Sequence, residues 1–129
     1  MKTSIAIIAA ILTFSACTHK AADFPAGKGG SAAITLFPQH HENAKSLTSF
    51  KVFVKYGTKD APASGIYDDS VSCTNHDSLV SGTFTGLRNG DYYFYGRGYD
   101  TSISENVHGG APYTITQQAA QNLNLPVSE

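Results

Sequence analysis

Histidines and acidic residues are the side chains of this sequence with the chemistry of metal ligands. His40 and His41 are adjacent and Glu42 follows them, while His76 and His108 stand further along the chain. Imidazole and carboxylate groups bind zinc and other transition metals. Neighbouring residues of a strand face opposite ways, so His40 and His41 can share a metal only if their strand has already ended. Because no H-x-H, H-x₃-H or C-x₂-C spacing is present, we predict solvent-exposed loop histidines and no metal site.

Nucleophilic and hydrolytic motifs are missing from the sequence. It contains no G-x-S-x-G, no H-E-x-x-H and no glycine-rich loop of the kind that binds phosphate. A nucleophilic thiol needs a base or a cation that lowers its pKa, and the residues next to Cys73 are serine and threonine. We therefore predict that the protein is not an enzyme, that it needs no cofactor and that the Cys73 thiol is inert.

An aromatic run at positions 92–99 (YYFYGRGY) is the strongest candidate for ligand binding. Strand alternation places Tyr92 and Phe94 on one face and Tyr93, Tyr95 and Arg97 on the other. Flat rings stack on sugars, and arginine pairs with acidic groups or stacks on rings. Tyrosines are also ordinary strand residues that pack against cross-strand neighbours, so both interpretations stay open. The loop expected at 100–110, which is polar and ends in two glycines, is a second candidate.

Length, composition and charge limit the class of protein. The chain has 129 residues, of which 41% are hydrophobic and 15% charged, and its formal net charge is −1. Such a chain forms one ordinary domain and lacks the charge-rich composition of disordered proteins. It also lacks the basic surface that nucleic-acid binding requires, so we predict no nucleic-acid partner.

The first sixteen residues have the organisation of a signal peptide. Lys2 precedes an apolar stretch at 5–14 that is too short to span a bilayer. The segment Phe14-Ser15-Ala16-Cys17 resembles a bacterial lipobox, which implies cleavage before Cys17 and lipid on its thiol. The alternative is an ordinary secretory peptide cleaved near Ala16. Cleavage removes one of nine basic side chains and leaves eight against ten acids, a net charge of −2. Residues 17–29 are then a flexible tether and 30–129 the folded domain.

Short runs of alternating polarity, separated by turn residues, predict an all-β fold. The expected strands are Ser31 to Phe37, Phe50 to Tyr56, Ser81 to Leu87, Asp91 to Tyr99, Ala111 to Thr116 and Gln121 to Val127, with a weaker one at Ser70 to Cys73. Asn89-Gly90 is a typical hairpin turn. Six or seven strands in about 100 residues favour two packed antiparallel sheets with Greek-key connections.

The segment from Gly82 to Phe94 contains the pattern F-x-G-L-x-x-G-x-Y. It resembles the strand–turn–strand of prealbumin-like (transthyretin-like, carboxypeptidase-regulatory-like) sandwich domains. Most of residues 29–127 is similar to small Bacteroidota-type lipoproteins of this fold, which share the Gly98-Tyr99-Asp100 step and the glycine pair 109–110. The resemblance implies a single prealbumin-like Greek-key β-sandwich of about seven antiparallel strands. It also implies that Leu87 and Tyr92 lie in the core, which leaves Tyr93, Tyr95 and Arg97 on the outer face.

These features together predict a non-catalytic cell-envelope lipoprotein that binds a glycan, a peptide or a protein partner. Its membrane contact is the lipid on Cys17. The alternatives are a structural envelope component without a small-molecule ligand and a small metal-binding envelope protein. Thr18 is no acidic retention signal, and only Asp23 is acidic in the residues that follow Cys17. We therefore expect the outer membrane of a Gram-negative bacterium, on its periplasmic side rather than at the cell surface.

Overall fold

The structure, a computed structural model, describes residues 25–41 and 47–129. The lipobox segment, most of the expected tether and Glu42 lie outside the described residues. The described chain forms strands with these bounds: β1 (Lys28–His40), β2 (Leu47–Tyr56), β3 (Asp69–Ser72), β4 (Thr74–His76), β5 (Leu79–Leu87), β6 (Gly90–Asp100), β7 (Glu105–Ile115) and β8 (Ala120–Val127). Within these ranges no helix is long and apolar enough to cross a membrane.

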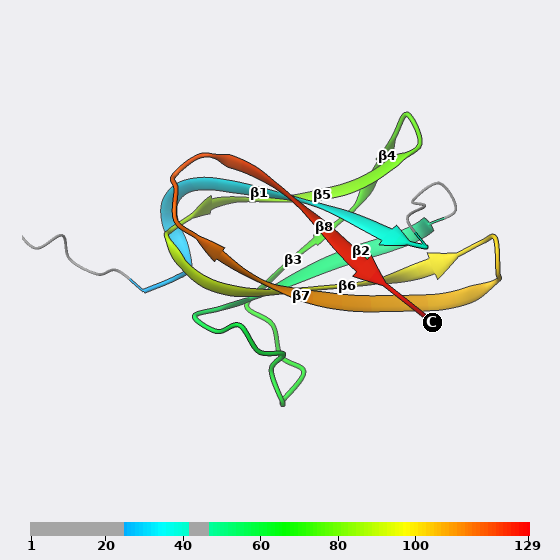
Figure 1. The fold of residues 1–129 in the computed structure, drawn as a ribbon, viewed down its shortest axis with the longest axis horizontal. Helices are drawn as coiled ribbons and strands as arrows, with labels where there is room; N and C mark the ends of the chain where they lie inside the picture. Colours follow the sequence, from blue (N-terminus) through cyan, green and yellow to red (C-terminus); the bar gives the residue numbers. More distant parts are fainter. Residues whose placement is uncertain (1–24, 42–46) are drawn as a thin grey trace, which may run out of the picture.

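The strands form two four-stranded sheets that pack face to face (Figure 1). Sheet I has the order β4-β5-β1-β8, and sheet II has the order β3-β2-β6-β7. The predicted β-sandwich is thus confirmed. The described residues contain eight strands rather than about seven. One of their strand pairs is not antiparallel: β1 runs parallel to β8, in a register that places His40 beside Val127. The sequence patterns carry no signal for strand order, so this pairing was not expected.

Alternating apolar residues of both sheets form the core between them. Along β1, Ala32, Ile34 and Leu36 are fully buried, and the residues between them are only partly buried. Leu87 and Tyr92, which the family pattern assigns to the core, are 0% exposed, so that expectation is confirmed. The other buried apolar side chains are Leu47, Phe50, Val52, Val54, Val80, Phe84, Phe94, Val107, Ile115, Leu125 and Val127.

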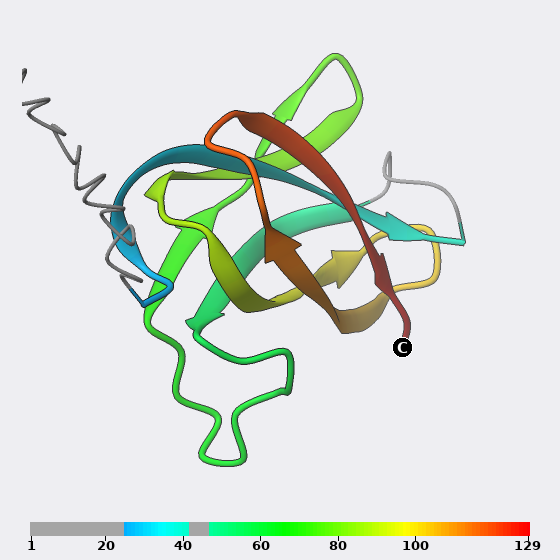
Figure 2. The ribbon, with the colours of Figure 1, turned by 60° about the vertical axis from the view of Figure 1, so that its left-hand side comes forward.

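The connection between β6 and β7 is shorter than the sequence suggested. We expected a loop over 100–110, but β6 continues to Asp100 and β7 begins at Glu105, which leaves a turn of four residues. The glycine pair 109–110 lies inside β7, where small residues are needed because other groups approach closely. A β-carbon at Gly109 would lie 2.1 Å from the carbonyl oxygen of Pro126. The long connection is instead the one between β2 and β3, which extends away from both sheets (Figures 1 and 2).

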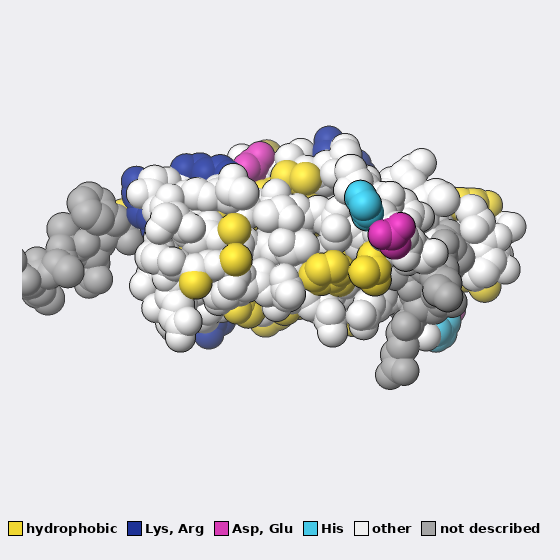
Figure 3. All heavy atoms as spheres, turned by 90° about the horizontal axis from the view of Figure 1, so that it is seen from above, with side chains coloured by type: hydrophobic (Ala, Val, Ile, Leu, Met, Phe, Trp, Pro, Cys, Tyr) yellow, Lys and Arg dark blue, Asp and Glu magenta, His cyan; other side chains and the backbone are white. Residues whose placement is uncertain are grey.

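The outer surface of sheet I is mostly polar. Figure 3 shows the molecule from above the view of Figure 1, and on this side the hydrophobic side chains form small, separate groups. Across this face the Thr35 and Thr83 hydroxyls form a 2.9 Å hydrogen bond between β1 and β5. The aromatic side chains of Phe53, Tyr93 and Tyr95, which are only partly buried, lie on sheet II.

Candidate functional site

The outer face of sheet II carries the three residues selected from the sequence. Tyr92 and Phe94 of β6 point inward and are 0% exposed. Because strand residues alternate, Tyr93, Tyr95 and Arg97 point outward; the two tyrosines are half-buried and Arg97 is exposed. The structure therefore confirms their position on one outer face.

Tyr95 belongs to a cluster of three rings on this face. Phe53 of β2 lies opposite Tyr95 in the sheet register, with ring centroids 6.0 Å apart. Tyr67, from the β2–β3 connection, stacks on Tyr95 with centroids 5.5 Å apart and planes inclined by 14°. Tyr67 also lies 5.6 Å from Phe53. Burial in this cluster, together with the neighbouring Tyr93 and Tyr95, raises the pKa of the Tyr67 hydroxyl. The Tyr67 hydroxyl therefore stays neutral at physiological pH.

Two cationic side chains flank these rings. Lys51 and Arg97 lie opposite each other on β2 and β6. The Lys51 ammonium is 5.7 Å from the centroid of Phe53, and the Arg97 guanidinium carbon is 5.2 Å from it. Cations above a ring are attracted by its quadrupole, which offsets part of their mutual repulsion. Within the described ranges neither cation forms an ion pair with a carboxylate, so both are available to an anionic ligand.

Tyr95 and Arg97 separate two surface hollows. The larger, of about 590 Å³, is lined by Ser49, Lys51, Tyr95, Arg97, Gly98, Tyr99, Asn106, Val107 and His108. The smaller, of about 370 Å³, lies on the side of Phe53 and Tyr67. Neither is lined by a carboxylate of the described residues. We call this region, with Lys51, Phe53, Tyr67, Tyr95 and Arg97 at its centre, the aromatic face.

Two acidic residues border the aromatic face beside Phe53 and Tyr67. A third hollow, of about 390 Å³, contains Asp68 and Asp69. Asp68 accepts a 3.1 Å hydrogen bond from Lys55, and Asp69 lies 3.3 Å from the Lys28 ammonium. Although partial burial opposes ionisation of Asp68, hydrogen bonds from the Tyr56 amide and from Lys55 lower its pKa. Both acids are thus engaged by lysines, and the larger hollow beyond Arg97 keeps its positive character.

The structure separates Tyr93 from the other two candidates. Tyr93 lines neither of the two hollows. Its hydroxyl extends to Gly110 of β7, so closely that a β-carbon at that position would lie 2.2 Å from it. Phe53 and Tyr67, by contrast, were not selected from the sequence. Strand alternation places Phe53 on the same face as Lys51, but Tyr67 lies in a connection where no periodic pattern identifies its position.

The histidines divide into two groups. His76 and His108 are exposed, as predicted, but neither lies in a loop: His76 is the last residue of β4 and His108 lies inside β7. The prediction of a solvent-exposed loop residue is wrong for His40, which is the last residue of β1 and 2% exposed. Its Nδ1 lies 2.6 Å from Asp100 Oδ2 and its Nε2 lies 2.8 Å from Glu129 Oε2. The hydrogen bond with Asp100 raises the pKa of His40 against the opposing effect of burial, and Glu129 adds to the increase.

Cys73 has the environment of an unreactive thiol. It is partly buried and packs against the core beside Gly82. Burial raises its pKa to about 11, so the thiolate that would act as a nucleophile is scarce at neutral pH.

Comparisons of the chain with protein-family models, with curated proteins and with solved structures found no match.

Proposed function

We propose that this protein is a non-catalytic cell-envelope lipoprotein whose aromatic face binds an acidic glycan. In this proposal a lipid on Cys17 holds the protein to the outer membrane, on its periplasmic side, and the folded part is a prealbumin-like sandwich. The sequence alone predicts a glycan, a peptide or a protein as the partner and does not choose between them. The rings of the aromatic face, together with two cations that have no carboxylate partner among the described residues, favour a saccharide that carries carboxylate or sulfate groups.

The larger hollow is the observation that carries this proposal. Its volume of about 590 Å³ lies within the roughly 300–1,000 Å³ typical of small-ligand sites. Tyr95 provides an apolar wall, and Lys51 and Arg97 provide two positive charges. Sugar rings pack against aromatic side chains, and a guanidinium pairs with carboxylate or sulfate through two parallel hydrogen bonds. An acidic sugar satisfies both parts of the hollow at once.

The position of the hollow is compatible with membrane anchoring. The described chain begins at Pro25, at the end of the sandwich opposite to the β6–β7 turn (Figure 1). Tyr99 and Asn106 line the hollow and pair with each other close to that turn. Anchoring at the amino-terminal end therefore attaches the lipid at the end of the sandwich opposite to the hollow.

A glycan array tests the proposal. The full-length chain, purified in detergent, is applied to an array that contains neutral and acidic saccharides. We expect the strongest signals from acidic saccharides, and we expect them to weaken as salt is raised. Arg97→Ala should reduce binding about tenfold or more, because a hydrogen bond to a charged group contributes roughly 1.5–3 kcal/mol. Tyr95→Ala should also reduce binding, because it removes the ring against which the sugar packs. Lys59→Ala is the matched control, since Lys59 is an exposed cation outside the two hollows.

Two results would overturn the proposal. One is the absence of glycan binding by a folded wild-type chain, which would favour a structural envelope component or a peptide partner. The other is glycan binding that Arg97→Ala and Lys59→Ala reduce to the same small extent, because the aromatic face would then not be the site.

A further inference from the structure

Three segments that are distant in the sequence end at the same corner of the sandwich. β1 and β8 run parallel, with His40 beside Val127, so Glu129 lies just beyond the end of β1. The backbone of Ser128 is held by two hydrogen bonds to His108 of β7, of 2.8 and 2.9 Å. Asp100, the last residue of β6, approaches His40 from the other sheet. The fold thus brings the His40 side chain together with the carboxylates of Asp100 and Glu129.

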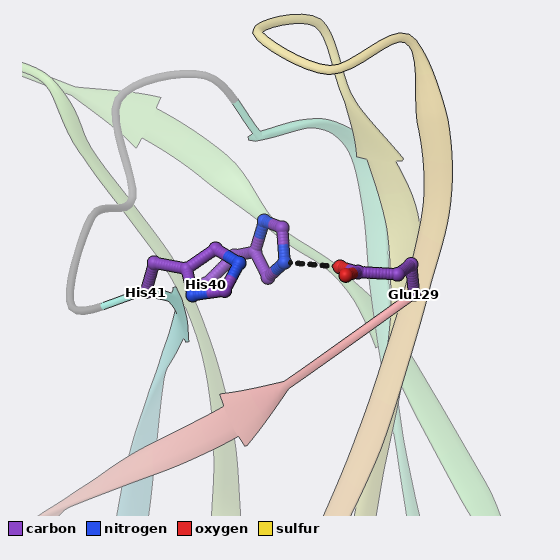
Figure 4. A group of neighbouring side chains, drawn as sticks. All are labelled: His40, His41 and Glu129. Carbon is purple, nitrogen blue, oxygen red and sulfur yellow. Dashed lines mark hydrogen bonds and ion pairs between the residues drawn. The ribbon is translucent and has the colours of Figure 1, made fainter.

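His41 joins this group because the strand ends at His40. The φ angle of His41 is 48°, which turns the chain out of the extended conformation. Its ring consequently does not point to the opposite face but lies 4.1 Å from the ring of His40, centroid to centroid. The condition under which the two histidines can share a metal is therefore met. Figure 4 shows both rings together, with Glu129 extending toward His40 from the end of the chain that follows β8.

The donor atoms are close enough for a single ion. One ligand atom from each of His40, His41 and Glu129 lies within 4.8 Å of the other two. The ligands of a tetrahedral zinc ion, each about 2.0–2.1 Å from the metal, lie roughly 3.4 Å apart. The distance from His40 Nε2 to Glu129 Oε2 is 2.8 Å, which is shorter than this value. The upper limit of 4.8 Å for the three ligand atoms is longer than it. Small rotations of the exposed His41 and Glu129 side chains are sufficient for coordination.

Asp100 orients the buried histidine for this role. It is 2% exposed, and its Oδ2 lies 2.6 Å from His40 Nδ1. Its other oxygen, Oδ1, accepts hydrogen bonds of 2.8 and 2.6 Å from the amide and hydroxyl of Ser102. The carboxylate is therefore fixed as an acceptor, which keeps the hydrogen on Nδ1 and directs Nε2 toward Glu129. A carboxylate behind a metal-binding histidine is the usual outer-shell arrangement of zinc sites.

We propose that His40, His41 and Glu129 bind a zinc ion or a similar transition-metal ion, with Asp100 as a positioning residue. Two imidazoles and one carboxylate suit zinc, whereas calcium and magnesium prefer sites made of oxygen ligands. The ion lies between Nε2 and Oε2 in place of the proton that joins them, and that proton leaves to solvent. Three protein ligands leave the fourth position to water. None of these ligands lines either hollow of the aromatic face, and the site does not depend on the proposed glycan.

Calorimetric titration of the metal-stripped, full-length chain in detergent tests this proposal. We expect one equivalent of Zn²⁺ to bind and to raise the melting temperature, because an ion that binds only the native state stabilises it. Ca²⁺ and Mg²⁺ at the same concentration should do neither. His41→Ala and Glu129→Gln alter exposed side chains and should each weaken Zn²⁺ binding at least tenfold. The control is His76→Ala, since His76 is an exposed histidine on another hairpin.

The outcomes separate a metal site from a purely structural ion network. Absence of Zn²⁺ binding would overturn the proposal and leave His40 as a bridge between Asp100 and Glu129. Binding that survives in both His41→Ala and Glu129→Gln, or that is lost in His76→Ala, would also overturn it, because the ion would then be held elsewhere.

Asp100→Asn tests the positioning role through affinity rather than stability. The variant is titrated at a temperature at which circular dichroism shows it to be folded. Outer-shell partners of metal ligands typically change affinity by about 10–100-fold, and we expect a loss in that range. A variant that melts at a lower temperature but binds Zn²⁺ as tightly as the wild type would show that Asp100 does not position the ligand.

Discussion

The hydroxyl of Tyr92 connects the start of the folded chain to the β5–β6 turn, and its removal gives a sharp test of the core. The oxygen accepts a 2.8 Å hydrogen bond from the amide of Gly27 and donates a 2.7 Å bond to the carbonyl of Arg88. Tyr92 is 0% exposed, and burial raises the pKa of its hydroxyl. Tyr92→Phe keeps the ring but leaves a buried donor and an acceptor without these partners.

The expected loss of stability follows from those two groups. A buried polar group that loses its hydrogen bond costs about 1–3 kcal/mol, so we expect Tyr92→Phe to lower the free energy of unfolding by about 2 kcal/mol. For a domain of this size that corresponds to a decrease of roughly 8 °C in melting temperature. Urea unfolding of the full-length chain, followed by circular dichroism, measures the change. Hydrogen exchange of the Gly27 amide should accelerate more than that of the core strands.

Tyr113→Phe is the matched control for this measurement. The Tyr113 hydroxyl donates a 2.6 Å bond to the side chain of Gln121 in a partly buried position. Because the Gln121 side chain can turn to water, this substitution should cost only about 0.5–1 kcal/mol. If Tyr92→Phe costs no more than Tyr113→Phe and the Gly27 amide stays protected, the hydroxyl of Tyr92 does not hold the start of β1.

Three further predictions concern single residues. The pKa of the Cys73 thiol is raised to about 11, so at pH 8 it should react with a disulfide reagent about 100-fold more slowly in the folded chain than in urea. The rates are measured in a Cys17→Ser background, and equal rates would contradict the burial of Cys73. Gly96→Ala should destabilise the protein by about 1–3 kcal/mol in urea unfolding, because the new β-carbon would lie 2.6 Å from Phe50 and 2.7 Å from Leu125. A variant as stable as the wild type would show that the two sheets are not packed as described. In cells, Cys17→Ser should abolish labelling with an alkyne fatty acid and release the protein from the membrane fraction, and unchanged labelling would rule out lipidation at this residue.

Periodicity in the sequence was sufficient to predict most of the strands. The two-residue period of Phe50, Val52 and Val54, with Lys51 and Lys55 on the other face, predicts both the strand and its buried face, and all three apolar residues are buried. The same two-residue period places Tyr95 and Arg97 together on the outer face of sheet II. These are local properties, because side-chain direction along a strand depends only on the position in that strand.

Properties that depend on neighbouring strands were not predictable in the same way. Tyr67 lies in an irregular connection, yet it stacks on Tyr95, which is 28 positions later in the chain. Asp100 was placed at the start of a long polar loop, but pairing with Leu47 extends β6 to this residue and buries it. In both cases tertiary packing outweighs local sequence preference, and one sequence carries no direct record of such contacts.

The direction of one strand determines whether the proposed metal ligands meet. β8 pairs with β1 from Ala33 to His40, and the parallel direction brings the end of β8 to the end of β1. If β8 ran antiparallel over the same residues, Val127 would pair with Ala33 and Glu129 would lie beyond it near Ser31, about 30 Å from His40 at roughly 3.3 Å per residue. His40 would then retain Asp100 but lose its second carboxylate. Zinc binding that requires both His41 and Glu129 would therefore test the parallel pairing of β1 and β8 as well as the site.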